Sequence, residues 1–143
     1  MLKQALFAIV VMLAAPVMAG DLSAISGRYS YARYSLTLAD GRQLGLQDLG
    51  ATRGVLDIDK STIELIMVMA DGKVIRARAR VLSAEVGANS GHWIAQWPDM
   101  SYPVRADFSY SKDAVDYTTK FQEPSDPQRY GSEERAHLER ARN

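Results

Sequence analysis

The sequence contains no cysteine, and it lacks the motifs of the common enzyme classes. Without cysteine the fold has no disulfide bond, no thiol nucleophile and no thiolate metal ligand. There is also no Gly-x-Ser-x-Gly elbow, no His-Glu-x-x-His pair, no phosphate-binding loop and no dinucleotide fingerprint. We therefore expect a protein that is not an enzyme and that has no cofactor and no metal ion.

An excess of charge of either sign is also missing, because 17 basic residues balance 17 acidic ones. A nucleic-acid-binding surface needs a basic excess to displace counterions, so we expect no nucleic-acid partner. Histidine is scarce as well, with two in the chain. His137 follows Glu134 at the spacing of half a carboxylate-bridged metal site, but the second copy that such a site needs is absent. We predict that both histidines are surface residues.

Residues 1–19 have the composition of a secretory signal peptide. Lys3 precedes an apolar segment over residues 5–15, and Val17-Met18-Ala19 leads into Gly20 with small residues at the positions that a signal peptidase recognises. The apolar segment is shorter than the ~20 residues of a membrane-spanning helix. The sequence thus predicts cleavage after Ala19, a periplasmic or secreted protein, and no transmembrane segment after cleavage.

Residues 62–86 predict a long β-hairpin. An apolar run and an alternating run flank Asp71-Gly72, which is the strongest short-range hairpin signal. A three-residue loop with a left-handed glycine gives the register that keeps one face apolar. It pairs Ile63 with Ala79, Leu65 with Ala77 and Met67 with Ile75. The opposite face then carries Arg76, Arg78 and Arg80 beside Ile66 and Val68.

The remaining strands are expected at near-regular spacing with short turns, over residues 27–38, 54–59, 92–96, 102–110 and 115–121. In the first of them Tyr29 and Tyr31 share one parity and Tyr34 the other, which predicts a bulge near Arg33. Residues 42–53 are glycine-spaced and predict a long loop with a short edge strand that covers a barrel mouth. This pattern is typical of an all-β, antiparallel up-and-down barrel of seven or eight strands, with residues 20–122 as the barrel domain.

Residues 123–143 form a polar C-terminal tail with two alternative structures. Pro124 and Pro127 cannot extend a central strand, because proline has no backbone donor. Beyond them, residues 132–140 have the composition of a helix with Ser132 as its N-cap. The alternation around Ala136 and Leu138 instead predicts an eighth strand that closes the barrel. Both alternatives stay open at this point.

Three short segments resemble motifs of the lipocalins and related small barrels. Gly27-Arg28-Tyr29 resembles the glycine-x-tryptophan opening of their first strand, with tyrosine in place of tryptophan. Val115-Asp116-Tyr117 resembles their threonine-aspartate-tyrosine motif, and Arg140 or Arg135 resembles their late, closing arginine. The resemblance implies an eight-stranded cup that binds a small, mostly apolar molecule between its strands.

The candidate binding residues are of two kinds. The arginine row consists of Arg76, Arg78 and Arg80, whose three neighbouring guanidinium groups need acidic partners. The row is therefore either a solvated outer face or a pocket wall that binds a carboxylate or phosphate group. Aromatic side chains at a barrel mouth also line ligand sites. We therefore predict a small hydrophobic or anionic amphipathic ligand, bound by Arg76, Arg78, Arg80, Trp93, Trp97 and Tyr117.

Two other functions are compatible with the residues. An envelope protein-interaction or assembly factor, acting as a homodimer or with an envelope protein, would use an exposed face of Ile66, Val68 and Leu82 beside the arginines. An enzyme would have to use Asp116, Tyr117 or Arg78, and no motif supports that function.

Overall fold

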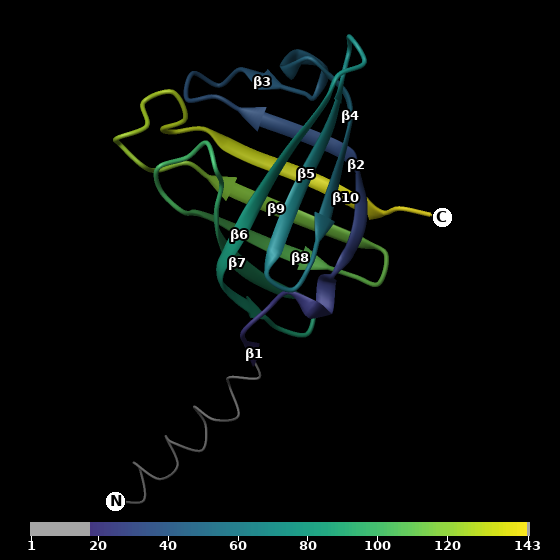
Figure 1. Ribbon diagram of the computed structural model, residues 1–143. Coiled ribbons are helices and arrows are strands. Elements are labelled where there is room, and N and C mark those ends of the chain that lie inside the picture. The colour runs from purple at the N-terminus through teal and green to yellow at the C-terminus, as the bar shows by residue number, and fades with distance from the viewer. Residues whose placement is uncertain (1–17, 143) are drawn as a thin grey trace, which may run out of the picture.

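The protein forms a closed antiparallel barrel in which eight consecutive strands each pair with the next (Figure 1). The computed structural model describes residues 18–142, so most of the predicted signal peptide lies outside the described residues. β10 pairs with β2 and closes the barrel. The barrel strands are β2 (Gly27–Thr37), β4 (Ala51–Ile58), β5 (Thr62–Met69), β6 (Val74–Val86), β7 (Ser90–Gln96), β8 (Val104–Tyr110), β9 (Ala114–Lys120) and β10 (Glu133–Arg140).

Short elements cover the two ends of the barrel. β1 (Met18–Ala19) pairs with the end of β6, and the 3-10 turn η1 (Ser23–Ile25) follows it across one end. β3 (Gln43–Leu44) pairs with β2 at the opposite end, next to a second 3-10 turn, η2 (Gln47–Leu49). Figure 1 shows η1 at the bottom of the barrel and β3 at its top. Within residues 18–142, no helix has the length and apolar character needed to cross a membrane.

The β5–β6 hairpin has the predicted register. Ile63 pairs with Ala79, Leu65 with Ala77 and Met67 with Ile75, and Gly72 has the left-handed φ of +87° that the three-residue loop requires. Ile63 and Ala79 are fully buried inside the barrel. The apolar pattern therefore determines which face of this hairpin points inward.

The outer face of the hairpin carries the arginines, and an acidic residue relieves their mutual repulsion. Glu64 lies between two of them, 3.2 Å from Arg76 Nη1 and 3.3 Å from Arg78 Nη2. The expected apolar patch beside them is smaller than predicted. Leu82 is 47% exposed, but Val68 is half-buried and Ile66 is buried at 9% exposure. The prediction that Ile66 is exposed was wrong.

The predicted bulge in β2 occurs at Ala32. Arg33 pairs with His137 and Tyr31 pairs with Leu138, so the residue between them has no partner on β10. The extra residue reverses the alternation of the strand, and Tyr34 therefore points inward like Tyr31. A single bulge thus places tyrosines from both halves of β2 inside the barrel.

The C-terminal segment Glu133–Arg140 is the closing strand and not a helix. It pairs with β2 on one side and with β9 on the other, so the barrel extends to Arg140. Its inward-facing residues, Ala136 and Leu138, are buried at 6% and 0% exposure. The apolar alternation here outweighs the helical composition because a strand at this position removes both open edges of the sheet.

Candidate ligand-binding cavity

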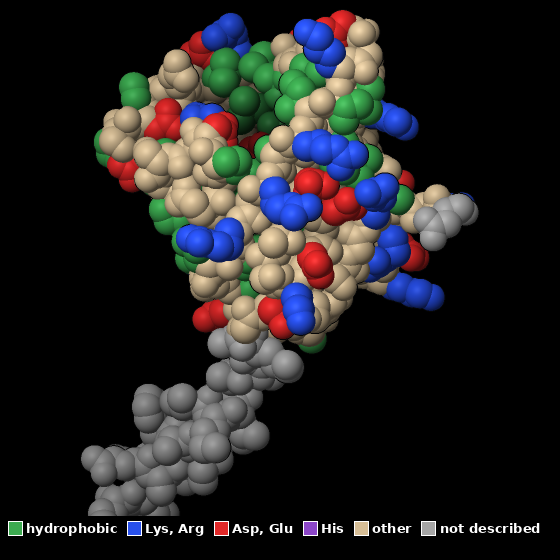
Figure 2. Space-filling view, in the orientation of Figure 1, with side chains coloured by type: hydrophobic (Ala, Val, Ile, Leu, Met, Phe, Trp, Pro, Cys, Tyr) green, Lys and Arg blue, Asp and Glu red, His purple; other side chains and the backbone are tan. Residues whose placement is uncertain are grey.

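The barrel interior holds a cavity of about 260 Å³. It lies toward the end that carries β3 and η2, where Figure 2 shows a hollow lined by hydrophobic side chains at the top of the molecule. Most of its lining is apolar and comes from strands all round the barrel. The apolar lining consists of Leu46, Leu49, Leu56, Ile63, Leu65, Met67, Ala77, Trp93, Trp97, Met100, Val104, Ala106 and Phe121.

The predicted ligand-binding residues divide between the inside and the outside of the barrel. Trp93, Trp97 and Tyr117 line the cavity. The row of Arg76, Arg78 and Arg80 is exposed on the outer face and contributes nothing to the cavity wall. The correction follows from the register, because the alternate residues Ala77 and Ala79 face inward.

The residues that an enzyme would have to use also divide between the inside and the outside of the barrel. Tyr117 lies inside the barrel, whereas Asp116 and Arg78 lie on its surface. Asp116 bonds to His137 on the outer face of β10, with 2.7 Å between Oδ1 and Nδ1. Asp116, Tyr117 and Arg78 therefore do not form one site.

One wall of the cavity is polar and centres on Glu134. This residue shares the inward parity of Ala136 and Leu138 on β10 and lines the cavity. The Tyr34 hydroxyl donates a hydrogen bond to Glu134 Oε2 at 2.7 Å. Ala136 pairs with Tyr34 on β2 and with Tyr117 on β9, so its small side chain stands between two inward tyrosines. The carboxylate thus lies at the edge of an aromatic cluster.

The environment of Glu134 disfavours charge. Burial raises the pKa of its carboxyl group, and the hydroxyl groups of Tyr34 and Tyr117 and the charge of Arg129 offset part of that rise. Burial also raises the pKa of the hydroxyl groups of Tyr31, Tyr34 and Tyr117, and the carboxylate raises each of them further. All three tyrosines are therefore neutral hydrogen-bonding groups at neutral pH, and Glu134 is the ionisable group of this wall.

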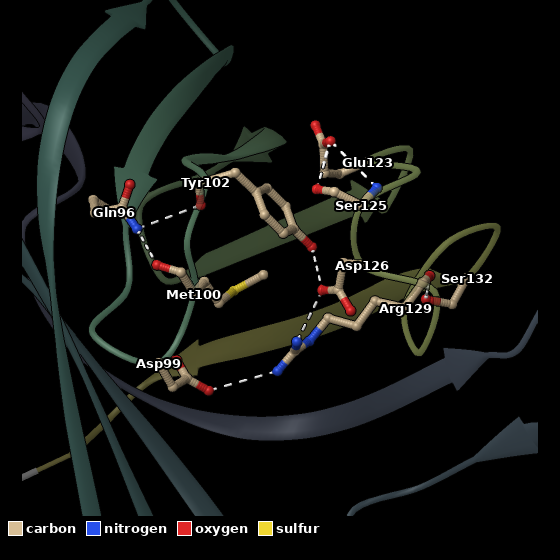
Figure 3. Close-up of polar contacts among 9 residues, drawn as sticks. All are labelled: Gln96, Asp99, Met100, Tyr102, Glu123, Ser125, Asp126, Arg129 and Ser132. Carbon is tan, nitrogen blue, oxygen red and sulfur yellow. Dashed lines mark hydrogen bonds and ion pairs between the residues drawn. The ribbon is translucent and has the colours of Figure 1, made fainter.

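Two loops meet at the mouth of the cavity through the mouth network of Asp99, Tyr102, Asp126 and Arg129 (Figure 3). The Tyr102 hydroxyl donates to Asp126 Oδ2 at 2.6 Å. Arg129 lies between two carboxylates, 2.9 Å from Asp126 and 3.5 Å from Asp99. Burial and the hydrogen bond to Asp126 raise the pKa of Tyr102 to about 12, and the Tyr102 and Arg129 hydrogen bonds lower the pKa of Asp126. The network joins the β7–β8 loop to the β9–β10 loop.

Each side of the mouth also has local support. Gln96 Nε2 donates to the carbonyl oxygen of Met100 at 2.6 Å and to that of Tyr102 at 3.4 Å, which shapes the β7–β8 loop (Figure 3). On the other side, Leu46, which precedes η2, and Leu49, its last residue, line the cavity at the position of the predicted covering loop. Leu49 is 37% exposed, so the cover consists of a few apolar side chains over open space.

The opposite end of the barrel is closed by Arg140. Its guanidinium lies over the Tyr29 ring at 4.9 Å, with 2.9 Å from Nη2 to the Tyr29 hydroxyl oxygen. It also donates to the carbonyl oxygens of Ser26 and Lys112, both at 3.1 Å. A side chain at Gly27 would collide with Arg140 Nη1. The Gly-x-Tyr segment and the late arginine thus contact each other, and of the two candidate arginines it is Arg140 that makes this contact.

The barrel has the closed, eight-stranded up-and-down topology that lipocalins also have. No family model and no curated protein matches the sequence. Two solved structures are similar to it in fold. One is a lipocalin-like protein from Bacteroides uniformis, with 10% identity, a TM-score of 0.48, and coverage of 82% of this chain and 98% of that one. The other is a de novo designed fluorescence-activating β-barrel, with 18% identity, a TM-score of 0.40, and coverage of 84% and 99%.

Sequence reasoning missed the polar residues in and around the cavity, namely Glu134 and the mouth network. One signal for Glu134 was present, because in a closing strand it shares the parity of Ala136 and Leu138. For Arg129 the sequence offers no such signal. Its partner Asp99 belongs to a different loop, 30 residues earlier in the chain, and only the closed barrel brings the two together.

Proposed function

We propose that this lipocalin-like barrel binds a small, mostly apolar molecule with one polar group, and that it does so without chemistry. This proposal rests on one observation. Side chains fill the barrel at one end, whereas a cavity of about 260 Å³ remains at the other end. Ligand pockets usually measure ~300–1,000 Å³, so this one suits a ligand smaller than a typical drug. The apolar walls would bury its body, and the Glu134 wall would orient its polar group.

We also propose that binding takes place outside the cytoplasm, in the periplasm or after secretion. Support comes from residues 1–19, whose composition is that of an export signal. A barrel without cysteine needs no oxidative step to fold in such a compartment.

Native mass spectrometry of protein purified gently from its own cells tests the binding function. We expect the mass of one small molecule in addition to the polypeptide, lost when the protein is denatured. Ala77→Leu extends a side chain into the cavity, so the additional mass should disappear. Arg78→Ala is the matched control, since its side chain lies on the opposite face of the same strand.

The control also tests the earlier assignment of the arginines. Retention of the ligand by Arg78→Ala and its loss from Ala77→Leu would support binding inside the barrel. Loss from Arg78→Ala alone would move the site to the outer face and contradict the proposal. A folded wild-type protein that carries no additional mass and binds no added amphipathic molecule would also contradict it.

A further inference from the structure

The charged groups around the cavity sum to a negative charge. Glu134 and Asp99 line it, together with a single basic residue, Arg129. Arg129 is already held by Asp126 and Asp99, which balance its charge and leave it little capacity for an anionic ligand (Figure 3). Among residues 18–142, no lysine, arginine or histidine forms an ion pair with Glu134. The cavity thus has a carboxylate without an ion-pair partner, and its one basic residue is already paired with two other carboxylates.

Aromatic rings lie next to that carboxylate. Tyr31 contacts Tyr34 and Tyr117 edge-on, with ring centroids 5.8 Å and 6.4 Å apart. Trp93 follows at 5.7 Å from Tyr117, and all four rings line the cavity. The faces of aromatic rings attract cations, most strongly when water is excluded. A carboxylate beside several aromatic rings is therefore suited to a positively charged organic group.

Glu134 is half-buried, and the partial removal of a carboxylate from water is costly unless its charge is balanced. The hydrogen bond from the Tyr34 hydroxyl at 2.7 Å and the nearby Tyr117 hydroxyl offset part of that cost. A glutamine at this position would keep the hydrogen bond and avoid the cost of the charge. A bound cation is what would compensate for the charge that the protein retains here.

We infer that the cavity selects an organic cation, namely a small ammonium compound with an apolar body, whose charged group lies against Glu134 and the surrounding tyrosine rings. This inference rests on the proposed binding function and adds the class of ligand. The apolar body would lie against Leu65, Met67 and Trp97. The anionic ligand expected from the arginine row is disfavoured, since its head group would face Glu134.

Three probes that each have a phenyl ring on a four-carbon chain test the selectivity: phenylbutylamine, phenylbutanol and phenylbutyrate. The chain has two tryptophans, and both line the cavity, so intrinsic fluorescence reports binding directly. At neutral pH we expect the amine to bind about 10-fold or more tightly than the butyrate, with the alcohol between them. Glu134→Gln should weaken amine binding about 10-fold and change alcohol binding less than about 2-fold.

Two variants serve as controls for charge and position. Glu133→Gln removes the neighbouring carboxylate, which pairs with Arg135 on the surface, and should leave the affinity for all three probes unchanged. Glu134→Asp keeps the charge on a shorter side chain and should retain part of the preference for the amine. Thermal unfolding establishes that each variant is folded, and the three-probe comparison on the wild-type protein decides the selectivity if Glu134→Gln does not fold.

The outcomes separate this inference from the binding function. If the alcohol or the butyrate binds as tightly as the amine, or if folded Glu134→Gln keeps the full preference for the amine, the cation inference is wrong and the binding function stands. If none of the three probes binds, the cation inference is wrong, and the binding function is wrong as well if native mass spectrometry finds no bound molecule. A preference for the amine that depends on Glu134 and not on Glu133 supports both.

Discussion

The two ends of the barrel differ in how completely their side chains fill the interior. At the closed end Leu22, Ile25 and Tyr29 are no more than 1% exposed, and the Arg140 guanidinium bonds to three partners. At the open end the interior is partly empty and holds a carboxylate whose charge is disfavoured. The difference indicates that the closed end supplies the stability that allows the open end to keep a costly polar interior.

Removal of Arg140 tests this division with the largest expected effect. Arg140→Ala deletes three hydrogen bonds and the contact with the Tyr29 ring, and we expect the free energy of unfolding to fall by about 2–3 kcal/mol. Urea denaturation measures the change. The control is Arg135→Ala, whose exposed side chain pairs with Glu133 and should contribute less than about 0.5 kcal/mol. Equal losses in the two variants would contradict the role of Arg140.

A pair of alanines on β6 compares the two ends directly. Ala79 is fully buried, so Ala79→Leu should overpack the core and lower the free energy of unfolding by about 1–3 kcal/mol. Ala77 lines the cavity, so Ala77→Leu should leave stability within about 1 kcal/mol and weaken binding of the probes about 10-fold. Thermal unfolding and tryptophan fluorescence measure the two effects. Similar destabilisation by both variants would mean that no usable space exists beside Ala77.

The pH dependence of stability tests the cost of Glu134. The pKa of Glu134 is higher in the folded protein than in the unfolded chain. The contribution of this group to the free energy of unfolding is therefore most favourable below the ordinary carboxyl pKa of 4.5, and it falls as pH rises through the folded-state value. The Glu134→Gln variant should not show this fall in stability, because glutamine does not ionise. At neutral pH it should be more stable by on the order of 1 kcal/mol, or about 3–5 °C in Tm.

The difference between wild type and Glu134→Gln isolates this carboxyl group from the others. Tyr31, Tyr34 and Tyr117 face it and stay neutral over the range, and Arg129 stays charged. Carboxyl groups elsewhere titrate equally in both proteins. If the free energy of unfolding depends on pH identically in the two proteins from acid to neutral pH, ionised Glu134 does not destabilise the ligand-free protein.

The smallest effect is expected at the mouth network. Tyr102→Phe removes the hydrogen bond to Asp126 and should lower the free energy of unfolding by about 0.5–1 kcal/mol. Hydrogen exchange should become faster in residues 97–103 and 121–132 and stay unchanged around η1, because the closed end is independent of the network. Tyr130→Phe is the control, since Tyr130 is 51% exposed. Faster exchange at both ends would contradict that independence.

The features of the fold that follow from local periodicity could be predicted from the sequence. The register of the β5–β6 hairpin follows from its apolar alternation and from Asp71-Gly72, and the structure confirms it. The bulge at Ala32 follows from the change of parity between Tyr31 and Tyr34. In both cases one face must be buried, and a slip of one residue would expose it.

The polar part of the site could not be predicted in the same way. Residues 132–140 fit a helix by composition and a strand by alternation, and only pairing with both β2 and β9 decides between them. Glu134 has a defined position only after that choice. The local pattern of Arg76, Arg78 and Arg80 predicts a binding site, yet the alternation of the same strand places these side chains outside the barrel.

The seam between β2 and β10 also constrains how the chain can fold. Tyr34 and Ala136 pair across it although 102 residues separate them in the chain. Such long-range pairings form slowly, so the sheet stays open until Glu133–Arg140 is available. A nascent or truncated chain without that segment exposes the free edges of β2 and β9, which are templates for intermolecular pairing. The same eight residues that carry Glu134 into the cavity therefore also protect the chain from aggregation.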